Sequence, residues 1–174
     1  MNQEFLEKLS HVLRHEILTD PADCWPYGSD NSRLHQQAMA VAFPSNEEEV
    51  AALVGLCKSY RVPVTARGRG TATTGSGVPL PGGVVASFER MKDLVDFDPD
   101  SGYIKVQPGI SNRTVQDHCA EYGLFWPPDP GSADYCTVGG NLACNAAGPQ
   151  LSNTAAPEKI PWDCARLMAG EKFW

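Results

Sequence analysis

A glycine-rich segment places the strongest constraint on the fold of this chain. Residues 67–79, RGRGTATTGSGVP, contain four glycines and four hydroxyl side chains and follow directly on a short apolar run at 62–66. Glycine adopts positive φ without steric cost, so the segment is predicted to form a loop that turns several backbone amides toward one point. Such a loop can bind a phosphate or pyrophosphate, and an ordinary surface loop is the alternative.

The residues before this loop predict a strand–helix–strand unit. An apolar run at 39–43 predicts a buried strand, and Pro44 ends it. Ser45 stands three residues before Glu48, the spacing of a capping box, and a helix is predicted from there to about Tyr60. With a second strand at 62–66, the short connections indicate a βαβ unit. The glycine-rich loop then lies at the carboxyl end of a buried strand, where ligands usually bind in α/β folds.

The remaining elements are predicted from periodicity and turn residues. An amphipathic N-terminal helix is predicted from Phe5 to Ile17, with Pro21 as its stop and residues 20–34 as a polar loop. Further strands are predicted at 83–88, 94–97 and 103–107, with a turn at 98–102, and a helix at 114–122 is predicted to stop at Gly123.

Two later segments also have unusual backbones. Residues 126–132, WPPDPGS, hold three prolines that fix the chain, as either a ligand-positioning segment or a rigid connector. Residues 137–149, TVGGNLACNAAGP, are nearly all small, which predicts a short helix approached closely by a flat ligand or by another helix. Neither a Walker loop nor a G-x-G-x-x-G that opens a helix occurs.

Charge and cysteine content exclude several classes of function. Fourteen Lys and Arg against 21 Asp and Glu give a net charge of −7, which argues against nucleic acid as a partner. Six scattered cysteines without a C-x-x-C pair predict reduced, mostly structural thiols and no metal site. The four histidines are predicted to be surface residues rather than catalysts. No run is long and apolar enough for a transmembrane segment, so a cytoplasmic location is expected.

Taken together, these motifs resemble one family of flavoenzymes. The segments are PVTARGRGTATTGSGVPLPGGVV, FERM (88–91), PG (108–109), GLFWPPDPGS and TVGGNLACNAAGP, spread over residues 38–149. Their order and spacing resemble the PCMH-type FAD domain of the vanillyl-alcohol-oxidase superfamily, and within it the D-lactate dehydrogenase and glycolate oxidase branch. The resemblance implies an α+β fold, in which a small βαβ subdomain precedes the start of a second, mixed-sheet subdomain.

The resemblance also implies where FAD would bind. The pyrophosphate would lie in the first loop, the second segment would lie along the cofactor, and the third would close on the flavin side. The implied cofactor-binding residues are Arg67, Gly68, Arg69, Gly70, Thr71, Ala72, Thr74, Gly75, Ser76, Pro130, Ser132, Thr137, Gly139, Gly140, Asn141 and Gly148. Arg69, Ala72 and Ser76 stand where the commoner family form has glycine. The first loop has no His or Cys for covalent attachment, so noncovalent FAD is expected.

By this resemblance the intact enzyme would oxidise a small D-2-hydroxy acid, such as D-lactate or glycolate, by hydride transfer to FAD. The catalytic residues would lie in a substrate domain that is missing here, so a complementing C-terminal chain is a candidate partner. A noncatalytic FAD-binding subunit or an inactive truncated product is the alternative. For the complete enzyme, peripheral association with the inner membrane through a quinone acceptor is left open.

The last residues do not follow the family pattern. We divide the chain into an N-terminal helix and loop (1–37), an incomplete FAD domain (38–149) and an atypical tail (150–174). Read in a displaced frame, the codons from Leu151 onward can encode IKYGSTRENTLGLRAVDGRGEVL, which resembles the family's continuation. The hypothesis is therefore a frameshifted tail, with a true alternative ending as the other interpretation, and the nucleotide sequence of the gene decides between them. An incomplete domain is expected to have poor solubility and weak flavin retention.

Overall fold

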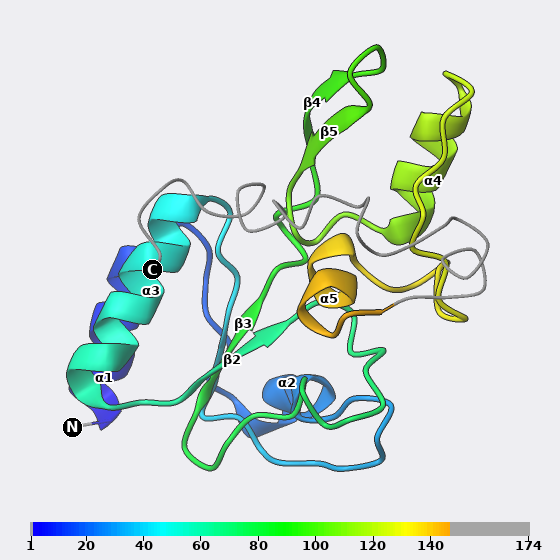
Figure 1. Cartoon of the computed structure of the whole chain (residues 1–174). Coiled ribbons are helices and arrows are strands. Elements are labelled where there is room, and N and C mark those ends of the chain that lie inside the picture. The colour runs from blue at the N-terminus through cyan, green and yellow to red at the C-terminus, as the bar shows by residue number, and fades with distance from the viewer. Residues whose placement is uncertain (1, 147–174) are drawn as a thin grey trace. The chain divides into compact units, whose positions relative to one another are not determined.

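The computed structural model of the chain describes residues 2–146, which divide between Met91 and Lys92 into two units, each treated by itself below (Figure 1). The predicted tail at 150–174 and Gly148 lie outside the described residues. The mixture of helices with parallel and antiparallel strands confirms the α+β class.

A three-stranded parallel sheet organises the first unit. Strands β1 (Ala40–Ala42) and β2 (Val64–Arg67) are joined by helix α3 (Glu47–Tyr60), so the predicted strand–helix–strand unit is present. Strand β3 (Val84–Ser87) comes later in the chain but lies between the other two, giving the order β1-β3-β2. β2 is therefore an edge strand, and its burial alternates, whereas β1 and β3 are buried throughout.

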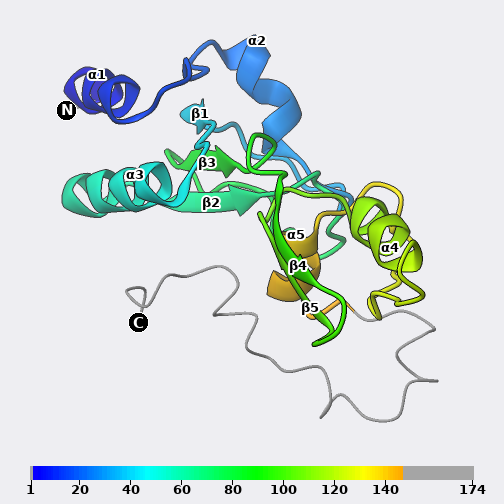
Figure 2. The same ribbon diagram turned by 90° about the horizontal axis from the view of Figure 1, so that it is seen from above.

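Side chains of β1 and β3 alternate between two faces of this sheet, because successive strand residues point to opposite sides. Ala40, Ala42, Val84 and Ala86 join a core with helices α1 (Asn2–Val12) and α3. These two helices lie side by side in both views (Figures 1 and 2). Val41 and Val85 on the other face join a second core with residues from α2 (Pro21–Cys24) and the 3-10 helix η1 (Trp25–Gly28).

The region around Pro21 differs from the prediction. The N-terminal helix ends at Val12 rather than near Ile17, and Pro21 begins helix α2 instead of ending α1. The Asp20 side chain caps α2 by accepting a hydrogen bond from the Ala22 amide at 2.8 Å. Proline is well suited to the first helical turn, where its missing N–H has no intrahelical partner in any case. The predicted loop at 20–34 therefore contains two short helices.

Helix α3 begins one residue later than the capping-box spacing predicts. Asn46, not Ser45, is the N-cap, and its side chain accepts from the Glu49 amide at 2.8 Å. Glu49 in turn accepts from the amide and the hydroxyl of Ser45, at 2.8 and 3.0 Å. Its carboxylate also accepts from the Arg14 amide at 3.3 Å, which ties the segment after α1 to the start of α3.

Replacement of Glu49 by glutamine is expected to lower the free energy of unfolding by about 1–2 kcal/mol at pH 7. Burial alone would raise the pKa of Glu49, but the hydrogen bonds from Ser45 and Arg14 outweigh it and lower that pKa. A lowered pKa in the folded state gives stability that is present above the unfolded value of 4.5 and is lost as pH falls through the folded value. Urea unfolding at pH 7 and at about pH 3 checks this, and a difference from wild type that stays constant between the two would contradict it.

The second unit contains an antiparallel hairpin and two helices. Strands β4 (Leu94–Asp98) and β5 (Tyr103–Val106) pair across the predicted turn, where Gly102 has a φ of 65°. Helix α4 (Asn112–Ala120) is capped by Ser111, and helix α5 (Val138–Ala143) follows the proline segment. A small core joins β5, α4 and α5 through buried residues that include Val106, Val115 and Val138.

His118 on α4, predicted to be a surface residue, is partly buried. Its side chain is 28% exposed. Its ring packs edge-on against Phe97, at 4.7 Å between centroids, and against Tyr122 at 5.5 Å. The position of His118 is explained by packing of α4 on the hairpin.

Candidate functional site

The predicted pyrophosphate loop starts at the last residue of β2 and leaves the carboxyl end of that strand. Nine predicted site residues lie in it: Arg67, Gly68, Arg69, Gly70, Thr71, Ala72, Thr74, Gly75 and Ser76. Gly70 and Gly75 have φ values of 69° and 82°, the left-handed conformation that side chains disfavour. Arg69, Thr74 and Ser76 are exposed on the loop. The loop therefore has two residues with the positive φ that occurs in anion-binding loops, together with exposed side chains.

The Arg67 guanidinium is bound to protein rather than directed into solvent. Its Nη2 donates to the Pro26 carbonyl at 3.1 Å, and its Nη1 donates to the Ser29 carbonyl. The φ of Gly70 favours glycine, and a Cβ placed there would lie 2.8 Å from the Arg67 Cζ, so a side chain at this position would displace the guanidinium. Burial lowers the pKa of Arg67, and the charge of Asp30 opposes this shift.

The second unit holds the other described site residues: Pro130, Ser132, Thr137, Gly139, Gly140 and Asn141. The Ser132 carbonyl accepts from the amides of Tyr135 and Cys136, each at 2.8 Å, which folds the end of the proline segment into a turn. Thr137 caps α5 by accepting from the Gly140 amide at 3.3 Å. These local hydrogen bonds order the backbone from Ser132 to the start of α5.

Gly139 allows α5 to approach the chain before α4. Its amide donates to the Pro108 carbonyl at 2.9 Å. A Cβ on Gly139 would lie 2.7 Å from the Pro108 Cβ and 2.9 Å from the Pro108 carbonyl oxygen, closer than real contacts allow. The close approach expected for this small-residue segment is therefore found at Gly139, and the neighbour is Pro108 rather than another helix. Its predicted role toward a cofactor stays a prediction.

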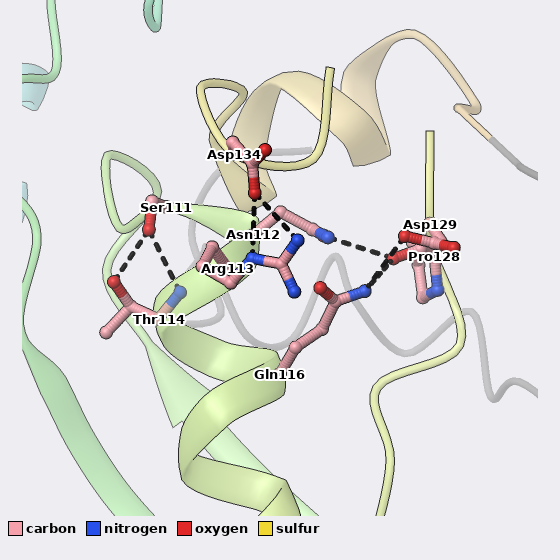
Figure 3. A network of polar contacts seen from close by, with 8 residues as sticks. All are labelled: Ser111, Asn112, Arg113, Thr114, Gln116, Pro128, Asp129 and Asp134. Carbon is pink, nitrogen blue, oxygen red and sulfur yellow. Dashed lines mark hydrogen bonds and ion pairs between the residues drawn. The ribbon is translucent and has the colours of Figure 1, made fainter. Parts of the chain in front are cut away.

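Asn112 at the start of α4 joins the two later segments in one buried polar cluster. Its Nδ2 donates to the Pro128 carbonyl at 3.0 Å, as Figure 3 shows. Its Oδ1 accepts from Trp126 Nε1 at 2.8 Å and from Asn141 Nδ2 at 2.9 Å. Asn112 is fully buried, and Asn141 is 5% exposed. A single side chain thus fixes the proline segment and α5 relative to α4.

Other polar contacts around Asn112 strengthen this arrangement (Figure 3). Gln116, one turn along α4, also donates to the Pro128 carbonyl, at 3.1 Å. Arg113 forms an ion pair with Asp134 at 2.7 Å. Both contacts cross from α4 to residues 128–134, so the segment that contains Pro130 and Ser132 is held on both sides.

The sequence reasoning missed both Asn112 and Asp30 as residues that shape these loops. The sequence contained one indication of the role of Asn112. Asn112, Val115 and Cys119 have the helical spacing of a buried face, and Asn112 is polar. A polar residue on a buried face requires hydrogen-bond partners. Asp30 left no such signal, because nothing local distinguishes it from other acidic loop residues.

The cysteines of residues 2–146 lie mostly in the interior. Cys24, Cys57, Cys119 and Cys136 are buried, as expected for structural thiols, and burial raises the pKa of Cys57 to about 11. Among the described residues, no group of three or more His, Cys, Asp and Glu side chains could hold a metal ion. None of the described helices is long and apolar enough to cross a membrane.

The described residues thus have an α+β fold, with a glycine-rich loop at the end of β2 in the first unit and a short helix of small residues, α5, in the second. Residues 38–155 match the FAD binding domain family, and the chain belongs to this family. The chain is 37% identical to the glycolate oxidase subunit GlcD of Escherichia coli K12 over 139 residues, 79% of this chain and 28% of the relative. It is 39% identical to a D-lactate dehydrogenase of Archaeoglobus fulgidus over 147 residues, 83% of this chain and 32% of the relative. The chain thus spans only about a third or less of these relatives.

Solved structures show the same fold. An alkyldihydroxyacetonephosphate synthase matches with a TM-score of 0.72 and 22% identity, over 83% of this chain and 30% of that one. A substrate-bound p-cresol methylhydroxylase matches with a TM-score of 0.67 and 18% identity, over 84% of this chain and 30% of that one. These matches confirm the expected PCMH-type fold for the N-terminal part of such a domain.

Proposed function

We propose that this chain is the N-terminal part of an FAD-dependent oxidoreductase that acts on a small D-2-hydroxy acid. The observation that carries the proposal is the loop at 67–79, which leaves β2 with two left-handed glycines and exposed hydroxyl side chains. Such a loop suits the pyrophosphate of FAD. FAD binding itself follows from membership of the family.

Within this proposal, residues 38–149 are the FAD-binding part, and their two groups of loop residues take different roles. Backbone amides of the first loop would bind the pyrophosphate, and Arg69 is the exposed cation nearest to them in sequence. Pro130, Ser132, Thr137, Gly139, Gly140 and Asn141 would contact the flavin side, held by the Asn112 cluster. FAD held by these residues would supply a hydride acceptor for the oxidation of a hydroxy acid at its α-carbon. We propose noncovalent binding.

The substrate class rests on the relatives. Curated relatives at 31–39% identity bear the names glycolate oxidase, D-lactate dehydrogenase and D-2-hydroxyglutarate dehydrogenase. All three named substrates are 2-hydroxy acids. A second candidate function, a noncatalytic FAD-binding chain completed by another chain, is favoured by one observation: the GlcD relative bears the name of a subunit of glycolate oxidase.

A flavin titration tests the proposal. Excess FAD is expected to bind the chain reversibly, seen as quenched flavin fluorescence, and to be lost on gel filtration, because a partial domain makes only part of the contacts. Riboflavin, which lacks the pyrophosphate, is the control and should be quenched far less. Acid precipitation should leave all flavin in the supernatant if binding is noncovalent. Equal behaviour of FAD and riboflavin would contradict the proposal, and bleaching of bound FAD by D-lactate would argue against the noncatalytic alternative.

A further inference from the structure

The segment 25–34 lies against the glycine-rich loop, although it precedes the loop by some forty residues and lies outside the matched family region. Four hydrogen bonds join this segment to the start, the middle and the end of the loop. The Arg67 guanidinium donates to the carbonyls of Pro26 and Ser29. The Asn31 amide donates to the Ala72 carbonyl at 2.9 Å, and the Asp30 Oδ2 accepts from the Gly77 amide at 3.1 Å.

Asp30 is the residue that organises this contact from the side of the N-terminal segment. Its Oδ1 accepts from the Ser32 amide at 2.9 Å, so the carboxylate fixes its own turn and the end of the loop together. Burial alone would raise the pKa of Asp30, but the hydrogen bonds from Ser32 and Gly77 and the charge of Arg67 lower it. Asp30 is therefore charged at neutral pH, and charge-assisted hydrogen bonds are the stronger ones.

Apolar and aromatic side chains of segment 25–34 also contact the glycine-rich loop. A Cβ on Gly75 would lie 3.0 Å from the Leu34 Cδ1, so the second left-handed glycine fits directly against the segment. The Arg67 guanidinium lies over the Tyr27 ring at 5.8 Å. A loop with four glycines loses much conformational entropy when it becomes ordered, and these contacts offset that loss before any ligand arrives.

We propose that Asp30 and Arg67 are positioning residues that order the glycine-rich loop in the absence of FAD, with segment 25–34 as a built-in support. The Arg67 guanidinium is then occupied by carbonyl groups of segment 25–34, so the Arg67 backbone is the part of this residue that can contact a ligand. The effect on flavin affinity rests on the proposed function above. When the loop is already ordered, less of the free energy of FAD binding is used to order it.

Limited proteolysis of the flavin-free chain tests the proposal directly, because Arg69 is an exposed trypsin site inside the loop. In Asp30→Ala, cleavage after Arg69 is expected to be about tenfold faster than in wild type, measured by mass spectrometry relative to cleavage after the exposed Arg90. Glu7→Ala, which removes an exposed carboxylate from α1, is the control and should leave the ratio unchanged. Asp30→Asn keeps one acceptor oxygen and should give an intermediate rate.

Two measurements, the cleavage ratio at Arg69 and FAD binding, distinguish failure of this proposal from failure of the proposed function. An unchanged cleavage ratio at Arg69 in Asp30→Ala, with far-UV circular dichroism equal to wild type, would overturn the positioning role whatever FAD does. If Asp30→Ala does not fold, the same comparison is made with Asp30→Asn. Failure of the wild-type chain to bind FAD would refute the proposed function alone, and FAD binding weakened about tenfold in Asp30→Ala would support both.

Discussion

Replacing Asn112 with alanine is expected to lower the free energy of unfolding of the second unit by about 3 kcal/mol or more. The substitution leaves Trp126 Nε1 and Asn141 Nδ2 without their acceptor, and it removes one of the two donors to the Pro128 carbonyl. Asn112 is fully buried, so water does not replace the lost hydrogen bonds without opening the structure. Urea unfolding followed by circular dichroism measures the loss.

Two variants show whether the loss arises from this cluster. Gln116→Ala removes one donor to the Pro128 carbonyl, which still accepts from Asn112, so a loss of only about 1 kcal/mol is expected. Asn141→Ala removes one partner of Asn112, and its effect should not add to that of Asn112→Ala in the double variant. Strict additivity, or a loss below about 0.5 kcal/mol for Asn112→Ala, would show that the cluster does not hold these segments together.

Gly139→Ala is expected to destabilise the second unit by about 1–3 kcal/mol, and Gly139→Val by more. The new Cβ would lie 2.7 Å from the Pro108 Cβ and 2.9 Å from the Pro108 carbonyl oxygen, and that oxygen accepts the Gly139 amide. Backbone atoms cannot rotate away as a flexible side chain can, so α5 itself has to shift. The measurement is the urea midpoint at constant slope, and a shift of α5 should also weaken FAD binding.

Gly131→Ala is the matched control for this prediction. Gly131 lies in the proline segment, and a Cβ there would meet nothing within 4 Å. Gly131 does not have a positive φ, so its backbone conformation is compatible with alanine. We expect a change within about 0.5 kcal/mol. Equal losses at 131 and 139 would mean that glycine is needed throughout the segment for flexibility and not for the approach to Pro108.

Much of the fold could be predicted because its signals are local. Apolar runs predicted β1, β3 and β5 to within two residues at each end, and the 98–102 turn was confirmed between β4 and β5. Helix starts were harder, because capping depends on which of several adjacent polar residues turns inward. Ser45 and Asn46 are both good caps, and the choice of Asn46 leaves Ser45 to bind Glu49. Pro21 was misplaced for a similar reason, since proline both ends one helix and begins another.

What the sequence alone determined is the backbone of the candidate site. The glycines at 70 and 75 and the small residues of α5 are local properties that predicted a loop and a short helix, and the resemblance of the motifs in their order and spacing predicted the FAD family. Only the tertiary structure decided what the polar side chains do. Arg67 reaches a carbonyl 38 residues away, and Asn112 reaches an amide 29 residues away. Hydrogen-bond partners at such separations are set by packing of distant segments, because a buried polar group pairs with whichever donor or acceptor the fold places beside it.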